Sequence, residues 1–260
     1  MLPGLSGSLL SHFFAERLLA IEFSGRLGEE TCAAAQQRLT DWQRKNAETL
    51  GPASGIRTVW DCTIRPLADV LGYTVTDRPL NPLEGRISSL LTAAHTRVGF
   101  LLGHWNVSLD ALWRHAVHTG LHFHCRWCIC SNGHEIRIVD GRHTYSRAHL
   151  HLDVERAIGD RRTFAVFWGL LRADAFQETD GRLSLFEQIV RESAKHSAGV
   201  SRSLRTSVLQ AVGDLLGGLL DARFRTHRRT PEGRGAAASA EATASHAKAE
   251  RPERALGPRE

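Results

Sequence analysis

Apolar side chains recur at helical spacing in the first part of the chain. One stripe lies within residues 9–23 and a second within 29–50, and a pair of helix-ending residues follows each. The run 56–73 predicts a third helix, which Pro66 interrupts. Residues 1–58 therefore predict an α-helical lead-in.

Short apolar runs bounded by turn residues come next and predict strands. Residues 87–93 and 97–105 are two such runs. Ser108 is suited to cap a helix over 109–118, because its hydroxyl can accept a hydrogen bond from the first helical turn. The order of these patterns predicts two strands and a helix that follows them.

The clearest local signal is an Asn132-Gly133 pair between two alternating runs. Asn and Gly tolerate the positive φ that a tight hairpin turn requires. We therefore expect strands at 126–130 and 135–139, with a further short strand near 149–152.

Helical patterns close the globular part. They cover 161–176, where Asp160 is suited as the N-cap, and then 182–196 and 200–220. The whole pattern predicts an α/β fold, with a small mixed β-sheet flanked by helices and an α-helical lead-in and exit. We divide the chain into the lead-in, an α/β core over 59–160, a helical connector over 161–222 and a tail.

The tail, 223–260, is rich in Ala, Arg, Gly and Pro and almost free of large apolar residues. It contains nine of the 33 Lys and Arg and five of the 28 Asp and Glu, so it carries four of the five net positive charges. Such a composition predicts a disordered basic tail. It is also what a GC-rich gene yields when it is read out of frame, so the tail is either native or the product of a frameshift.

The remaining composition indicates a cytoplasmic protein without a membrane anchor. The sequence contains no run of about 18 apolar residues, and its first residues lack the basic segment of a signal peptide. Five cysteines, an odd number, favour reduced thiols.

Cysteine and histidine side chains crowd residues 115–134. Cys125 and Cys128 have the spacing of half a zinc site, which Cys130 and His134 would complete. The alternative is that Cys128 and Cys130, on one face of a strand, are buried as small apolar groups. We expect the latter, and zinc stays an alternative.

Three residues after the second hairpin strand are candidates for nucleic-acid contact. Arg142, Tyr145 and Arg147 are of the types that bind phosphate. Solvated side chains and a tyrosine that covers the sheet edge are the simpler interpretation.

The order of these segments resembles the front part of single-chain type IIG restriction–modification enzymes. The similar stretches include LLGPASGIRTVWDCTIRPLADVLGY, VGFLLGHWNVSLDALWRHAV, RWCICSNGHEIRIVDGRHTYSRAHLHLDVERAI and SLFEQIVRESAKHSAGVSRSLRTSVLQAVGDLL. The resemblance covers about residues 9–222. It implies a PD-(D/E)xK restriction-endonuclease-like domain, a helical connector and then an N6-adenine methyltransferase that uses S-adenosylmethionine.

The methyltransferase part is not expected in this chain. The adenine-holding loop of that family is Asn-Pro-Pro followed by an aromatic residue, and the nearest match here is Asn81-Pro82-Leu83. S-adenosylmethionine therefore belongs to a module that is absent, and that module is the expected protein partner alongside DNA.

The nuclease positions that the resemblance implies also depart from the family. An acid on one strand and an acid-x-Lys signature on the next would hold Mg²⁺. Here the signature position reads Gly103-His104-Trp105, and the weak acidic candidates are Glu84 and Asp110. We expect an eroded site in a DNA-associated scaffold. An active Mg²⁺ nuclease with a rearranged site and a zinc-binding or structural interaction domain are the alternatives.

Overall fold

Seven strands in one mixed sheet form the centre of the computed structural model, which describes residues 2–75, 85–142, 144–178 and 181–227. The order across the sheet is β1-β7-β6-β5-β4-β3-β2. The pair β4–β5 is parallel and each other neighbouring pair is antiparallel. The strands are β1 (Leu5–Gly7), β2 (Thr74–Val75), β3 (Ile87–Ala93), β4 (Thr96–Leu102), β5 (Trp127–Ser131), β6 (Glu135–Asp140) and β7 (His149–Asp153).

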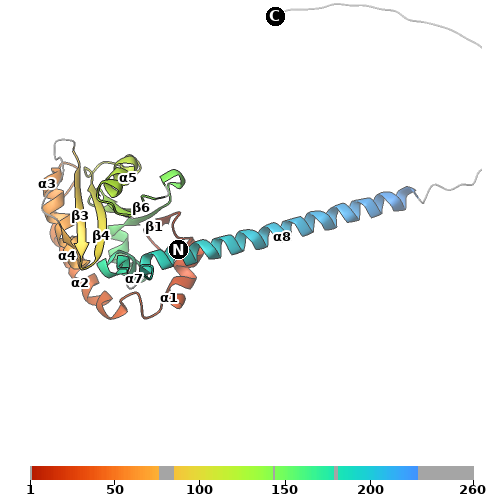
Figure 1. Cartoon of the computed structure of the whole chain (residues 1–260), viewed down its shortest axis with the longest axis horizontal. Helices are drawn as coiled ribbons and strands as arrows, with labels where there is room; N and C mark the ends of the chain where they lie inside the picture. Colours follow the sequence, from red (N-terminus) through yellow and green to blue (C-terminus); the bar gives the residue numbers. More distant parts are fainter. Residues whose placement is uncertain (1, 76–84, 143, 179–180, 228–260) are drawn as a thin grey trace, which may run out of the picture. The chain divides into compact units, whose positions relative to one another are not determined.

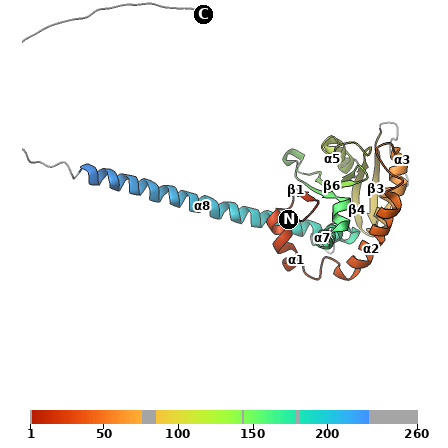
Figure 2. The ribbon, with the colours of Figure 1, turned by 180° about the vertical axis from the view of Figure 1, so that it is seen from behind.

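Helices cover both faces of this sheet, with α5 on one side and α2, α3 and α4 on the other (Figures 1 and 2). The helical elements before β7 are η1 (Phe14–Leu18), α1 (Leu19–Glu22), α2 (Glu29–Asn46), α3 (Ile56–Val59), η2 (Trp60–Ile64), α4 (Arg65–Val70), α5 (Trp113–His122) and η4 (Thr144–Ser146). After it come α6 (Val154–Gly159), α7 (Arg161–Leu171), η5 (Ala173–Phe176) and α8 (Leu185–His227). The predicted α/β class, a mixed sheet flanked by helices, is confirmed.

The two faces of the central strands bury different cores because side chains alternate along a strand. On β5, Trp127 and Ile129 join the large core with the helices of one face. Cys128 and Cys130 join a smaller core beneath α5, with Leu112 and Trp113. Strands buried on both faces leave few positions for polar side chains.

The hairpin of β5 and β6 forms at the Asn132-Gly133 pair, as predicted. Gly133 has a φ of 102°, which L side chains rarely adopt. The Oδ1 atom of Asn132 accepts hydrogen bonds from the backbone of Glu135 at 2.9 Å and of His134 at 3.3 Å. The Asn132 side chain thus holds the turn that joins the strands.

Several boundaries differ from the sequence prediction. The α-helix is interrupted near Pro66, as predicted, but that proline itself lies in the first turn of α4, where its missing N–H is tolerated. The irregularity lies earlier, in η2, a single π-helical turn. The helix expected from Leu109 begins at Trp113. Asp160 caps α7 as predicted, by accepting from the Thr163 backbone at 2.7 Å.

The two helices expected at 182–196 and 200–220 are one continuous helix, α8. Gly199 lies within it, because an exposed glycine costs a helix only about 1 kcal/mol and does not by itself end one. The chain divides into two units, 1–205 and 206–260, and α8 runs through the boundary. The predicted tail belongs to the second unit, and its predicted start at 223 is wrong, because residues 223–227 continue α8; the residues from 228 on lie outside the described part.

One buried ion-pair cluster attaches the beginning of α8 to the sheet. The Arg126 guanidinium pairs with Glu187 of α8 and with Asp140 of β6, the latter at 3.3 Å. The side chains of Glu187 and Asp140 are almost fully buried. Burial raises the pKa of Glu187, but hydrogen bonds from Arg126 and Arg191 outweigh it and hold that pKa below its usual value.

None of the described helices has a segment long and apolar enough to cross a lipid bilayer.

Candidate functional site

The candidate site lies where β4 and β5 end. Because these strands are parallel, their carboxyl ends meet at the same edge of the sheet. The edge is continued by a hydrogen bond of 2.9 Å from the Gly103 backbone to the Ser131 carbonyl. This edge is a common place for ligands in α/β sheets, and it includes the position where the nuclease signature was expected.

Apolar packing fills the space beside Gly103, the first residue of the signature position. Gly103 is buried, and a Cβ atom there would meet Leu112 Cδ1 at 2.7 Å. His104, which follows it, is exposed and lies against the backbone of Gly85. Trp105 packs on the His134 ring, with 4.9 Å between the ring centroids. A carboxylate at Gly103 would displace the Leu112 side chain.

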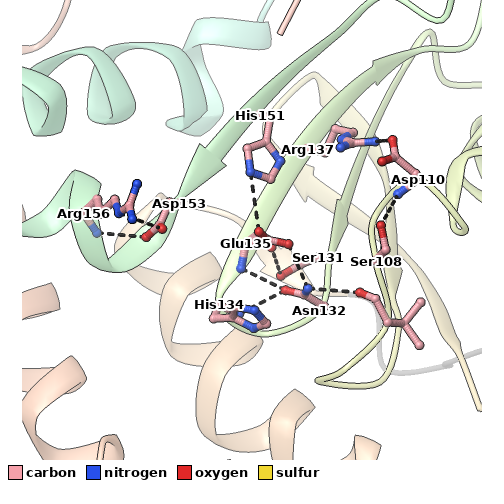
Figure 3. A network of polar contacts seen from close by, with 11 residues as sticks. Ser108, Asp110, Ser131, Asn132, His134, Glu135, Arg137, His151, Asp153 and Arg156 are labelled. Atoms are coloured by element: carbon pink, nitrogen blue, oxygen red, sulfur yellow. Dashed lines mark hydrogen bonds and ion pairs between the residues drawn. The ribbon is translucent and has the colours of Figure 1, made fainter. Parts of the chain in front are cut away.

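The acidic candidate Asp110 is engaged by an arginine (Figure 3). Its Oδ1 atom accepts a hydrogen bond of 2.6 Å from Arg137 Nη1. The side chain of Arg137 is 10% exposed and that of Asp110 is 82% exposed. The hydrogen bond and charge of Arg137 lower the pKa of Asp110. The other candidate, Glu84, lies outside the described residues.

A polar network fixes the turn after β5 to the loop after β4 (Figure 3). Asn132 Nδ2 donates to the Val107 carbonyl and to Glu135 Oε2, both at 3.1 Å. Ser131 Oγ donates to the Glu135 carbonyl at 2.7 Å and accepts from the Gly133 backbone at 3.0 Å. The polar side chains of the turn therefore already form hydrogen bonds that fix the backbone.

His151 of β7 lies beside this network. Its Nε2 atom is 3.7 Å from Glu135 Oε1, and its Nδ1 atom is buried without a hydrogen-bond partner among the described residues. Burial lowers the pKa of His151, and the nearby Glu135 carboxylate opposes that shift. The neutral imidazole is therefore favoured near pH 7.

The alternative zinc site does not form. Within the described part of the chain, no three His, Cys, Asp or Glu side chains lie as a metal site requires, so Cys125, Cys128, Cys130 and His134 are not brought together. Burial raises the pKa of Cys130 to about 12 and that of Cys128 well above its usual value. Both thiols lie in the core beneath α5, where the thiolate that zinc needs is disfavoured.

The three candidates for nucleic-acid contact share one exposed segment between β6 and β7. Tyr145 is 85% exposed, and Arg142 and Arg147 are also exposed. The Arg142 backbone donates to Asp140 Oδ1 at 2.8 Å, and the Arg147 carbonyl contacts His149 Nδ1 at 2.9 Å. Arg147 has a φ of 47°, so the segment is sharply bent there. These candidates thus lie on one segment that follows β6, and not at the buried ends of β4 and β5.

The sequence patterns did not reveal a recess beside the site. It has a volume of about 240 Å³ and lies between α2, η2 and the β5–β6 turn. Trp42, Thr63, Trp105 and His134 are among its lining residues. They are distant in the sequence and follow no motif, so only the fold shows that they share a cavity.

Comparison of the chain with protein-family models, with curated proteins and with solved structures finds no match.

We predict that Asp110→Asn lowers the free energy of unfolding by about 1 kcal/mol at pH 7, because Arg137 is mostly buried and loses its charged partner. The folded-state pKa of Asp110 is lowered, so its contribution is present above the unfolded pKa and is lost as the pH falls through the folded one. Urea unfolding of wild type and variant over a series of pH values from 7 downward measures both effects.

Asp69→Asn is the matched control, because Asp69 and its partner Arg38 are both largely exposed. We expect a smaller loss for it at pH 7. An equal loss in both variants at pH 7, or a loss in Asp110→Asn that does not shrink as the pH falls, would contradict a specific role of the Asp110–Arg137 pair.

Proposed function

We propose that this chain is the DNA-associated, non-cleaving front module of a restriction–modification protein of the type IIG kind, with a restriction-endonuclease-like sheet. Support for the fold comes from β3 and β4, which are adjacent and antiparallel. The resemblance needs its first acid and its acid-x-Lys signature on two such neighbouring strands. The helix α5 then connects β4 to the parallel strand β5.

The proposal that the chain does not cleave DNA rests on the packing at Gly103. Leu112 occupies the space where a carboxylate side chain would begin. Asp110, the acidic candidate among the described residues, is hydrogen-bonded to Arg137. A nuclease of this kind needs carboxylates that face a Mg²⁺ ion, and Gly103, where the second of them is expected, has no carboxylate and packs on Leu112 instead.

The proposed DNA contact lies on the segment of Arg142, Tyr145 and Arg147. Arginine side chains bind phosphate oxygens, and the tyrosine hydroxyl is also suited to this contact. The first 222 residues are almost neutral overall, because the tail carries most of the net charge. A local contact of this kind is therefore required if the folded part binds DNA.

The proposed protein partner is the methyltransferase module, and we propose that it binds to α8. Nine large apolar side chains are exposed along this helix: Val200, Leu204, Val208, Leu209, Val212, Leu215, Leu216, Leu219 and Leu220. At helical spacing they form one broad stripe, whereas Ser203 and Gln210 lie on the other side. An apolar stripe of this length indicates an interaction surface.

We predict that the double variant Arg142→Ala/Arg147→Ala weakens DNA binding and reduces its salt dependence. Each lost phosphate contact lowers the slope of log affinity against log salt by about 0.9. Electrophoretic mobility shifts with a 30-base-pair duplex over a range of salt concentrations measure this slope. Arg57→Ala, an exposed arginine of α3, is the control. An unchanged slope in the double variant would place the DNA contact elsewhere.

We predict that the coding DNA beyond codon 223 contains, in another frame, a helical continuation and an Asn-Pro-Pro-aromatic motif. The polypeptide from that frame, co-expressed with this chain, should co-purify with it. Leu215→Glu/Leu219→Glu should weaken the association more than about tenfold, because it buries charge in an apolar interface.

The matched variant Ser203→Glu/Gln210→Glu adds the same charge to the opposite side of α8 and should leave the association unchanged. If no frame encodes such a motif, or if both double variants behave alike, the docking part of the proposal is wrong.

A further inference from the structure

Side chains of α2 form one wall of the recess of about 240 Å³ beside the β5–β6 turn. The π-helical turn η2 presents the Cys62 carbonyl to the side chains of α2. That carbonyl accepts hydrogen bonds from Trp42 Nε1 at 2.7 Å and from Asn46 Nδ2 at 2.9 Å. The indole of Trp42 is thereby fixed as part of the lining, and π-helical turns of this kind are frequent at functional sites.

Trp105 and His134 form another part of the lining. Their rings lie at 4.9 Å and 32° to each other. Gly133 allows Trp105 to lie close to the backbone of the turn, since a Cβ atom at Gly133 would meet Trp105 Cε3 at 2.9 Å. Two indoles and an imidazole therefore line one small cavity.

Two polar atoms of the lining residues have no partner within the described part of the chain. The hydroxyl of Thr63, a residue 2% exposed, makes no hydrogen bond there, and neither does the buried Nδ1 atom of His134. Buried polar groups in native proteins are hydrogen-bonded with few exceptions, so each such atom requires an explanation. Both atoms belong to residues that line the recess, so a rotation of the Thr63 side chain and of the His134 ring that turns them to the recess would let one ligand bond to both.

We propose that this recess binds one uncharged, planar nitrogen heterocycle of nucleobase size that carries an amino group. Its volume is just below the range of about 300–1,000 Å³ that is usual for drug-sized ligands, so it suits a single ring system. Aromatic side chains bind such rings by stacking. Glu155 lines the recess as well, and its carboxylate disfavours phosphate there and accepts from an amino group.

Two sources supply this chemistry, a free nucleoside and an unpaired base in a DNA strand. The inference does not rest on the proposed function, because adenosine tests it in the absence of DNA. The probes are adenosine, thymidine and a single-stranded oligodeoxyadenylate of ten nucleotides.

Saturation-transfer difference NMR titrations of the full chain with each probe measure the binding. We expect adenosine to bind, and thymidine, which lacks the amino group, to bind more weakly. Thr63→Val should weaken adenosine binding about three- to tenfold, as expected for one lost hydrogen bond. The same variant should keep or raise the melting temperature, because the removed hydroxyl has no partner in the described structure.

Ala47→Phe, on the α2 side of the recess, should abolish binding by filling the cavity. Ala33→Phe is its control, since Ala33 is exposed on α2 and does not line the recess. Binding of the oligonucleotide that Ala47→Phe abolishes would assign the site to an unpaired base, and binding of adenosine alone would assign it to a free nucleoside.

The proposal is overturned if neither adenosine nor the oligonucleotide binds the wild-type chain, or if binding is equal in Ala47→Phe and Ala33→Phe. A lower melting temperature of Thr63→Val with unchanged affinity would also overturn it, because the hydroxyl would then act in the fold alone.

Discussion

Burial of the parallel pair β4–β5 on both faces is the constraint on which the rest of this structure depends. On β4, Val98, Phe100 and Leu102 face the large core, and Leu101 faces the core beneath α5. A strand of this kind admits apolar and small side chains and excludes unpaired charges, because an isolated buried charge costs several kcal/mol. The described part of β4 thus carries one charged residue, Arg97, which is exposed.

This constraint explains where the polar chemistry of the molecule lies. Polar side chains gather where the strands end, in the loop after β4 and in the turn that Asn132 holds. Several charged side chains form ion pairs within the fold: Asp110 pairs with Arg137, and Arg126 pairs with Asp140 and Glu187. Thr63 and His134 keep unpartnered polar atoms in the described structure, beside a cavity rather than at the end of β4.

Much of the fold followed from local patterns. The strand 87–93 and the hairpin at Asn132-Gly133 were predictable because alternation and turn chemistry act over a few residues. The strands β1 and β2 were missed, since they are three and two residues long and form through pairing with β7 and β3. The continuity of α8 through Gly199 was also missed, because a glycine weakens a helix without ending it.

The candidate site was less predictable than the fold. The absence of acid and lysine at 103–105 was visible in the sequence, but the filling of that space by Leu112 depends on how α5 and the loop before it pack. The recess required five segments distant in the sequence to converge, and no spacing rule joins Trp42 to His134. The location of Cys128 and Cys130 in a core did follow from strand alternation.

The most direct measurement of the central claim is cleavage of supercoiled plasmid DNA by the purified chain with Mg²⁺, followed by gel electrophoresis beside the variants Glu84→Ala and Asp110→Ala. The account predicts that wild type and both variants leave the plasmid as intact as a buffer control does, at protein concentrations that shift a DNA duplex. Mg²⁺-dependent nicking by the wild type that disappears in Glu84→Ala would contradict it and would show a working nuclease site.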